Sequence, residues 1–382
     1  MKRIQLISAM FLLGSAPAFA FVIPSPPVLD NKAYVVMDFD SGKVLAESNS
    51  HIQLEPASLT KLMTSYIVER SLETGRLKES DPVSVSEYAW CRGTSAESCM
   101  YLPLHSQAPV LDMLRGVVIQ SGNDASKALA EHIAGSEPAF AEIMNSEAKR
   151  LGMKDTNFMN ATGLPDPAHM TTAYDIALLS RAIIHDNSKY YPIYAEKEFT
   201  WNGIKQGNRN ALLYTDPTVD GLKTGHTQNA GYCLAASSKR GNMRLITVIM
   251  GTNSMQARAD QTRALLNWGF SSYETVKPMS AGKVLADAPV WFGTESTVKA
   301  GLDRDLAITL PRGQKDGVQA VTRITPDLEA PIAKGQQVGE VVVTLDGKTI
   351  ATQPVVAMEP VEEANFIVRL WHHLKRFLSH IF

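Results

Sequence analysis

The sequence predicts an α/β (α+β) fold: an antiparallel sheet with a helical cluster, then a small all-β domain and a C-terminal amphipathic helix. Apolar runs typical of strands lie at both ends of the first region and helical periodicity fills its middle, so its two ends are expected to form one sheet. After Pro278 short β-rich runs replace the helical pattern and predict the second domain. The chain of 382 residues also exceeds the usual size of one hydrophobic core.

The chain opens with the pattern of a secretory leader. Lys2 and Arg3 are positive, residues 4–14 are mostly apolar, and Ala18-Phe19-Ala20 has the form of an A-x-A cleavage site. The apolar run is too short to span a membrane. We therefore expect a signal peptide at residues 1–20 and an exported protein. Without this leader 35 basic and 39 acidic side chains remain, a net charge of −4, which does not suggest a nucleic-acid partner.

The elements of the first domain follow in order. A β-hairpin is predicted where Ala33–Met37 and Lys43–Ala46 flank the turn Asp40-Ser41-Gly42. An amphipathic helix opens near Ala57, because apolar side chains recur at i, i+3, i+4, i+7 and i+8 from Leu59. Four further helices are expected at 110–120, 124–134, 138–151 and 173–185. Thr172 and Asp175, at capping-box spacing, open the last of these four. A second hairpin at 232–237 and 243–250 and a helix at 256–268 complete the domain.

Five β-rich runs predict the strands of the second domain. They are Pro289–Phe292, Leu306–Leu310, Val318–Ile324, Val341–Leu345 and Thr349–Val355, with the turn Asp346-Gly347 before the last of them. We place the domain boundary near residue 276. The exported chain then divides into a first domain at 21–276, a β-rich domain at 277–361 and a tail at 362–382.

The tail is amphipathic from Asn365 to Phe382. One helical face is apolar (Phe366, Ile367, Leu370, Trp371, Leu374, Phe377, Leu378 and Ile381) and the other is polar and basic (Arg369, His372, His373, Lys375, Arg376, Ser379 and His380). This pattern is typical of a helix that lies in a membrane interface, and its frequent charges exclude a membrane span. A helix docked on its own protein is the alternative. The polar-face histidines need no metal to explain them.

Three short motifs indicate the chemistry. They are Ser58-Leu59-Thr60-Lys61, Ser121-Gly122-Asn123 and Lys223-Thr224-Gly225, in this order. The first pattern alone is weak, since Ser146 and Lys149 repeat its spacing, but Ser-x-Asn and Lys-Thr-Gly each occur once. The ordered set indicates a serine acyl-transfer site of the penicillin-binding kind.

The residue types suit that chemistry. Ser58 needs a base within hydrogen-bond reach, and Lys61 lies one helical turn away on the same side. Burial and a second cation, for which Lys223 is the candidate, would lower the pKa of Lys61 enough for it to act as a base. At the start of the helix the backbone N–H of Ser58 lies in a field that favours negative charge. It can therefore supply half of an oxyanion hole.

The other two motifs supply polar groups around this pair. Ser121 can relay a proton to the leaving amine, and Asn123 can bond a substrate carbonyl and orient the lysine. Thr224 can bind a carboxylate, and Gly225, expected just before a strand, lets a substrate backbone approach the sheet edge. Taken alone, either tripeptide reads equally well as an ordinary turn.

The chain resembles the low-molecular-mass penicillin-binding proteins, and within them the serine D-alanyl-D-alanine carboxypeptidases called penicillin-binding proteins 5 and 6. The three motifs carry the resemblance, together with residues 219–227, Asn208-Arg209-Asn210, Trp268-Gly269-Phe270, Val290-Trp291-Phe292-Gly293 and the amphipathic tail. It covers nearly the whole exported chain. It implies a β-lactamase/transpeptidase-like catalytic domain, a peptidoglycan pentapeptide substrate, inhibition by β-lactams and no cofactor or metal. The implied location is the periplasmic face of the inner membrane, reached through the tail.

The resemblance also assigns roles to residues. Ser58 is implied as the acylated nucleophile and Lys61 as the general base, with an oxyanion hole from the backbone N–H groups of Ser58 and His226. Thr224 and Arg258 are implied to hold the terminal carboxylate of the substrate; Arg258 matches by its position after the last strand of the sheet. The loop from Cys91 to Gln107 departs from the family pattern, and Ser126 stands where these enzymes often carry cysteine.

Two alternatives remain at this stage. A class A β-lactamase shares the motif order, but it uses a glutamate for deacylation and none occurs between Glu147 and Glu196. A cell-wall binding or shape-maintaining protein with slow turnover is the second. Cys91 and Cys99 either form a disulfide or stay as thiols in this exported chain, and Cys233 is expected to be buried and inert.

Overall fold

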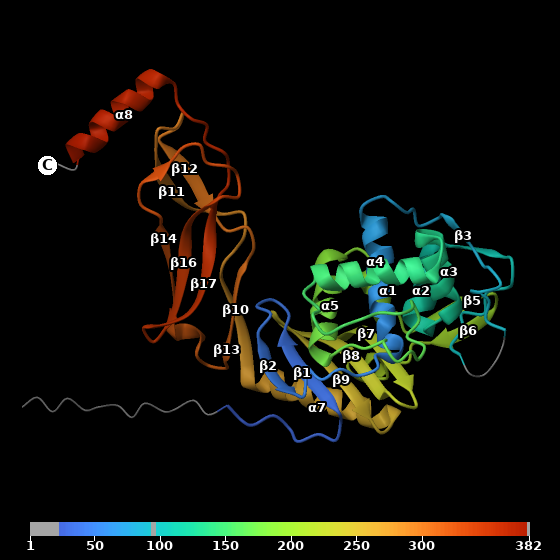
Figure 1. Ribbon diagram of the computed structural model, residues 1–382. Coiled ribbons are helices and arrows are strands. Elements are labelled where there is room, and N and C mark those ends of the chain that lie inside the picture. Colours follow the sequence, from blue (N-terminus) through green and yellow to red (C-terminus); the bar gives the residue numbers. More distant parts are fainter. Residues whose placement is uncertain (1–22, 93–96, 380–382) are drawn as a thin grey trace, which may run out of the picture.

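The computed structural model describes residues 23–92 and 97–379, so the expected leader lies outside the described residues. Five antiparallel strands form the sheet of the first domain, in the order β2 (Val44–Ser48), β1 (Ala33–Asp38), β9 (Met243–Thr252), β8 (Gly231–Arg240) and β7 (Val219–Thr227) (Figure 1). The predicted mixed fold, with a sheet formed from the two ends of the region, is confirmed.

Both faces of this sheet are buried. Val35 and Met37 of β1 pack in one core with the helical cluster, and Tyr34 and Val36 pack in a second core with α7 (Met255–Ser272). Figure 1 shows α7 below the sheet and the cluster above it. Burial on both faces explains why β1 and β9 are near-continuous apolar runs rather than alternating ones.

The other elements of the first domain connect or cover the sheet. They are η1 (Ala57–Thr60), α1 (Lys61–Glu73), β3 (Pro82–Ser84), β4 (Gln107–Pro109), α2 (Val110–Arg115), η2 (Gly116–Gln120), α3 (Asn123–Ala134), α4 (Glu137–Arg150), α5 (Ala173–Asp186), η3 (Tyr191–Ala195), β5 (Glu198–Trp201), β6 (Ile204–Gly207) and α6 (Leu212–Thr215). The Thr172 side chain accepts a hydrogen bond from Asp175 N at 3.0 Å, as its spacing predicts.

Three differences from the sequence analysis bear on the motifs and on the start of the second domain. The helix expected at 110–120 is an α-helix that ends in one π-helical turn, η2, and this turn leads to Ser121 with a left-handed φ of 62°. The tripeptide Lys223-Thr224-Gly225 lies within β7 rather than before a strand. Directly after α7 the chain enters β10 (Tyr273–Met279), three residues before the boundary expected near residue 276.

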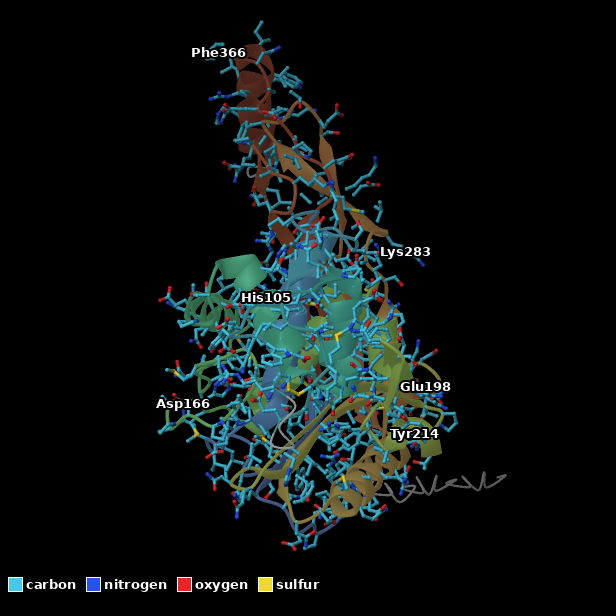
Figure 2. The ribbon with its side chains drawn as sticks, turned by 90° about the vertical axis from the view of Figure 1, so that its right-hand side faces the viewer. His105, Asp166, Glu198, Tyr214, Lys283 and Phe366 are labelled. Carbon is cyan, nitrogen blue, oxygen red and sulfur yellow. A yellow bond between two sulfur atoms is a disulfide. The ribbon has the colours of Figure 1, made fainter. Side chains whose placement is uncertain are left out.

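The second domain consists of strands around its own core. Its six-stranded sheet has the order β14 (Val318–Ile324), β16 (Gln337–Leu345), β17 (Lys348–Ala357), β12 (Thr297–Gly301), β11 (Val284–Trp291) and β15 (Leu328–Glu329). β10 pairs with β13 (Leu306–Pro311), and η4 (Lys315–Gly317) joins β13 to β14. The helix α8 (Phe366–Ser379) lies at the far end of this domain from the first, and Figure 2 shows Phe366 at the tip of the molecule.

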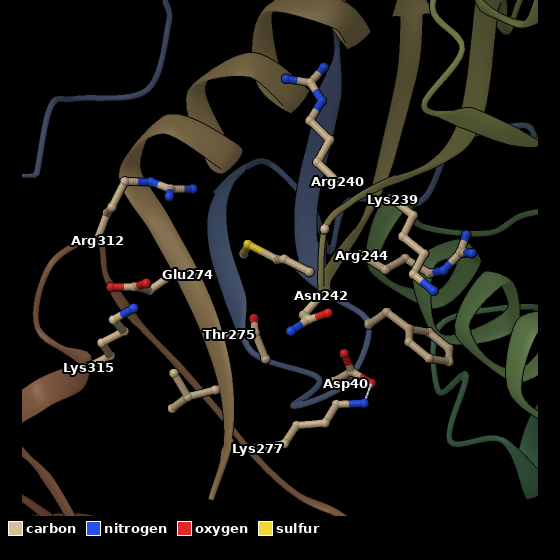
Figure 3. Close-up of a pocket in the computed structure, with 14 residues that line it drawn as sticks. Asp40, Lys239, Arg240, Asn242, Arg244, Glu274, Thr275, Lys277, Arg312 and Lys315 are labelled. Carbon is tan, nitrogen blue, oxygen red and sulfur yellow. Dashed lines mark ion pairs between the residues drawn. The ribbon is translucent and has the colours of Figure 1, made fainter.

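Polar contacts hold the two domains together. Asp38 accepts a hydrogen bond from Thr275 Oγ1 at 2.6 Å, and Lys277 pairs with Asp40 at 2.8 Å. Beside these contacts is a cavity of about 750 Å³, where Lys239, Arg240 and Arg244 of the first domain lie opposite Lys277, Arg312 and Lys315 of the second (Figure 3).

An acidic side chain is fully buried in the helical cluster. Glu69 of α1 accepts hydrogen bonds from Tyr194 Oη at 2.7 Å and from Asn187 Nδ2 at 3.0 Å. Burial raises the pKa of this carboxyl to about 8, although both hydrogen bonds act in the opposite direction. Glu69 is therefore protonated in the folded protein at neutral pH.

We expect Glu69→Gln to stabilise the protein increasingly as the pH rises. Below pH 4.5 the carboxyl is protonated in both the folded and the unfolded protein, so its ionisation does not affect the free energy of unfolding. Between pH 4.5 and about 8 the carboxyl ionises only in the unfolded protein. The free energy of unfolding therefore falls by at most about 1.4 kcal/mol per pH unit over this range. Glutamine does not ionise, so the Glu69→Gln variant does not show this decrease in the free energy of unfolding. Thermal unfolding at pH 5 and pH 8 measures this change, with Glu142→Gln on the exposed face of α4 as the control. An equal melting-temperature difference at both pH values would contradict a protonated Glu69.

Candidate active site

Ser58 lies in a single 3-10 turn, η1, that leads directly into α1. The side chain is half-buried, while its neighbours Leu59 and Thr60 are fully buried. Ala57, just before it, has a left-handed φ of 47° and turns the chain sharply at this point. Buried neighbours and a fixed turn hold the hydroxyl of Ser58 at the surface of a cleft.

Lys61, the first residue of α1, is fully buried. Its Nζ lies 3.2 Å from Ser58 Oγ, 2.7 Å from Asn123 Oδ1 and 2.6 Å from the backbone oxygen of Thr162. The two carbonyl oxygens can only accept hydrogen bonds. In a neutral amine they take both N–H groups, and the lone pair faces the hydroxyl of Ser58.

The surroundings favour that neutral form. Burial and, next, the positive charge of Arg209 lower the pKa of Lys61 to about 7, against the opposing effect of Asp124, Glu137 and Glu97. An amine with this pKa is close to half neutral at pH 7. Lys61 can therefore accept a proton from Ser58 under ordinary conditions.

The oxygen of Thr162 is held in place by Asn160. Asn160 Oδ1 accepts hydrogen bonds from the backbone N–H groups of Thr162 and Gly163, at 3.1 and 2.7 Å. Gly163 has a φ of 82°, and a Cβ there would lie 1.8 Å from the oxygen of Ala57. Only glycine lets this loop lie against the turn that carries the serine.

The second motif lies between two helices. Ser121 is buried in a left-handed conformation after η2, and Asn123 begins α3. Asn123 Oδ1 accepts from Lys61, and its Nδ2 donates to Glu97 Oε2 at 3.0 Å. Ser121 and Ser58 line the same cavity.

The third motif is on edge strand β7, opposite η1. A Cβ at Gly225 would lie 3.0 Å from the oxygen of Pro56 and 3.3 Å from the side chains of Ala57 and Leu59, so glycine allows the strand to approach the serine turn. Thr224 and Gly225 line the cavity of Ser58, whereas Lys223 is fully buried beside it.

Three cations surround this end of the cleft. Burial first, and then the charges of Lys61, Arg209 and Arg258, hold the pKa of Lys223 well below its usual range. Burial also lowers the pKa of Arg209 and that of Arg258. Among the described residues none of these three cations forms an ion pair with a carboxylate. The site is therefore a positive pocket that an anionic group of a ligand can neutralise.

Two adjoining cavities, of about 360 and 350 Å³, form the cleft. Both include Ser58, Glu97, Ser98 and His226. Arg209, Thr224 and Arg258 line the first cavity, and residues 162–165 line the second. His226 is exposed and stacks on Tyr232, with ring centroids 4.0 Å apart.

The structure thus brings together residues of all three motifs with His226 and Arg258. Sequence reasoning missed Glu97, Ser98 and the oxygen of Thr162, and it named Lys223 rather than Arg209 as the cation beside Lys61. Arg209 lies in the Asn-Arg-Asn tripeptide that contributes to the resemblance, which was the one available signal. Within the described parts of the chain no group of three His, Cys, Asp or Glu side chains could hold a metal ion.

Comparisons with known proteins agree with this geometry. Residues 21–254 match the family described as "D-alanyl-D-alanine carboxypeptidase", and residues 273–363 match "Penicillin-binding protein 5, C-terminal domain". The D-alanyl-D-alanine carboxypeptidase DacA of Escherichia coli K12 is 42% identical over 393 aligned residues, which cover 100% of this chain and 98% of the relative.

Solved structures give the same result. Penicillin binding protein 5 from Haemophilus influenzae has a TM-score of 0.82 and 44% identity, covering 89% of this chain and all of that chain. Penicillin-Binding Protein D2 from Listeria monocytogenes, in the cefotaxime-bound form, has a TM-score of 0.59 and 28% identity, covering 65% of this chain and all of that one. With a serine and a buried lysine in contact and matches along almost its whole length, the chain belongs to the D-alanyl-D-alanine carboxypeptidase family.

Proposed function

We propose that this protein removes the terminal D-alanine from peptidoglycan pentapeptides through a Ser58 acyl-enzyme, and that β-lactams acylate the same serine. The observation that carries the proposal is the contact of the buried Lys61 amine with Ser58 Oγ and two carbonyl oxygens. Family membership favours this activity over a β-lactamase or a cell-wall protein without turnover. The relative bound to cefotaxime supports acylation by β-lactams.

In this mechanism neutral Lys61 takes the proton of Ser58, and Oγ attacks the carbonyl carbon of the penultimate D-alanine. The backbone N–H groups of Ser58 and His226 receive the oxyanion. The departing amine takes a proton by way of Ser121, and free D-alanine leaves. A water molecule then adds to the ester, and the serine leaves with a proton, which restores the enzyme.

The terminal carboxylate of the peptide is the natural occupant of the positive pocket. Arg258 is buried on α7, with Nη1 donating to the oxygen of Gly225 at 3.3 Å. Thr224 lies on the same side of the cavity. We infer that these two side chains hold the carboxylate, with Lys223 adding positive charge behind them.

The two domains and the tail have separate roles in this proposal. Residues up to Ser272 carry every group named in the mechanism, and the β-rich domain from Tyr273 joins them to α8. His372 Nδ1 accepts a hydrogen bond from the Phe292 backbone at 2.8 Å, so the polar side of α8 contacts the domain.

The apolar face of α8 is left open. Six of the described large apolar side chains on this face are exposed, among them Phe366 at 76%, Ile367 at 78% and Leu370 at 60%. None of the described helices is long and apolar enough to cross a membrane. We propose that α8 lies in the interface of the periplasmic face of the inner membrane, with its basic residues toward anionic lipid.

We expect penicillin to add its mass to Ser58 with a rate that rises as the pH passes through about 7, because only neutral Lys61 acts as a base. Lys61→Arg should lower this rate by about 10²–10⁴-fold, since arginine stays charged. The measurement is mass spectrometry over time at several pH values.

Ser58→Ala should show no adduct. The matched control is Lys149→Arg, at the same spacing from Ser146 on the exposed face of α4. An adduct on another serine, or normal acylation of Lys61→Arg, would refute these assignments.

Arg258→Ala should reduce hydrolysis of a D-Ala-D-Ala peptide by roughly 10–100-fold, the size expected for one charge-assisted hydrogen bond. Penicillin acylation should fall less, because the fused ring is rigid and reactive and depends less on a held carboxylate. Kinetics with both substrates test this. Arg263→Ala, further along α7 and paired with Asp260, is the control. Equal losses with both substrates would count against a carboxylate-specific role.

Leu370→Glu combined with Leu374→Glu should release the protein from anionic vesicles without changing its activity on small peptides. Burial of apolar area in the membrane contributes about 25 cal/mol per Å² to binding. The two substitutions remove apolar area from the exposed face of α8 and leave the His372 contact in place. Co-sedimentation measures it. Val321→Glu with Ile350→Glu, exposed apolar residues of the second domain, is the control and should still pellet. If the tail variant also pellets, α8 is not the anchor.

A further inference from the structure

A segment closed by a disulfide carries a carboxylate into the active site. Cys91 and Cys99 are bonded, and Glu97 lies inside this closed segment. Two hydrogen bonds hold the adjoining backbone, from Asn123 N to the oxygen of Ser98 at 2.8 Å and from Gln206 Nε2 to the oxygen of Cys99 at 3.0 Å. The position of Glu97 is therefore set by contacts with two different parts of the fold.

The residues that follow are fastened as well. Met100 N and Leu102 N donate to the two carboxylate oxygens of Asp124 at 2.8 and 3.0 Å. Arg209 Nη1 donates to Ser98 Oγ at 2.7 Å. This loop is the one whose sequence departs from the family pattern.

Glu97 acts directly on Asn123. Its Oε2 accepts from Asn123 Nδ2 at 3.0 Å, and the Lys127 ammonium lies 3.7 Å from the same oxygen. A carboxylate can only accept hydrogen bonds, so the NH₂ group of Asn123 must face Glu97. The amide oxygen must then face Lys61, 2.7 Å away. With the amide reversed, its NH₂ group would face the amine and Lys61 would lose an acceptor.

We propose that Glu97 is a positioning residue for acylation, which fixes the amide of Asn123 so that Lys61 points its amine at Ser58. This inference rests on the proposed function, because it concerns the base of that reaction. It also has an electrostatic part. Glu97 lines both cavities that contain Ser58, and its negative charge favours the protonated form of Lys61.

Several other charged groups face Lys61. Arg209 and Lys223 carry positive charge, and Asp124 and Glu137 carry negative charge. Burial lowers the pKa of the nearby His169 to about 4, so this imidazole is neutral. Loss of the Glu97 charge leaves this set more positive. The pKa of Lys61 should then fall further, and the lower edge of the pH–rate profile should move to lower pH.

Two variants separate orientation from charge. Glu97→Gln keeps an acceptor oxygen for Asn123 but removes the charge, whereas Glu97→Ala removes both. Acylation by penicillin is measured from pH 5 to pH 9. We expect Glu97→Ala to lower the high-pH rate about tenfold, Glu97→Gln to restore most of it, and both to move the lower edge down by roughly half a pH unit. Glu87→Gln, an exposed glutamate of the same region, is the control and should match wild type.

The possible results are distinct. If both variants keep the wild-type rate and profile, Glu97 has no positioning role. If the acylation rate falls equally in both variants and the lower edge of the pH–rate profile does not move, Glu97 only supports the folding of its loop and the proposal is wrong. A wild-type protein that penicillin does not acylate would instead refute the proposed function itself.

Discussion

The structure depends on one buried lysine whose pKa lies close to neutral pH. Lys61 is fully buried, and an ammonium there would need three acceptors to replace its hydration. The fold offers two carbonyl oxygens and the hydroxyl of Ser58, but burial and the positive charge of Arg209 still lower the pKa of the amine to about 7. Each neighbouring element serves this balance: η1 supplies the serine, α3 the amide, and the glycine at 163 lets the loop bearing Thr162 come close.

Much of this architecture was predictable from local chemistry. The paired hairpins, the Thr172 cap and the three ordered motifs depend on short-range spacing, which a sequence displays directly. β7, β10 and β12 were among the strands missed, because other residues interrupt the apolar pattern of each: Lys223-Thr224-Gly225 in β7, Pro278 in β10, and Lys299 and Gly301 in β12. The Thr162 oxygen and Glu97 could not be foreseen, because a backbone carbonyl has no sequence signature and Glu97 reaches Asn123 only by tertiary folding.

The positive charge of the pocket lined by Arg209 and Arg258 lowers the stability of the free protein. Lys223, Arg209 and Arg258 lie near one another with no carboxylate paired to them in the described residues, and a bound anion would relieve their mutual repulsion. Burial of like charges lowers the stability of the empty fold, and binding recovers that energy at the point of recognition.

The three cysteines give the chain a choice of pairings when its disulfide forms. Cys91 and Cys99 are eight residues apart, whereas Cys233 comes more than 130 residues later. Closing the short loop costs less entropy, by roughly 2–3 kcal/mol, so the native pair forms first in an unfolded chain. Once β8 is in place, burial raises the pKa of the Cys233 thiol to about 11, and a thiol that rarely ionises seldom attacks a disulfide. Mispairing is thus opposed first by chain length and then by the completed sheet.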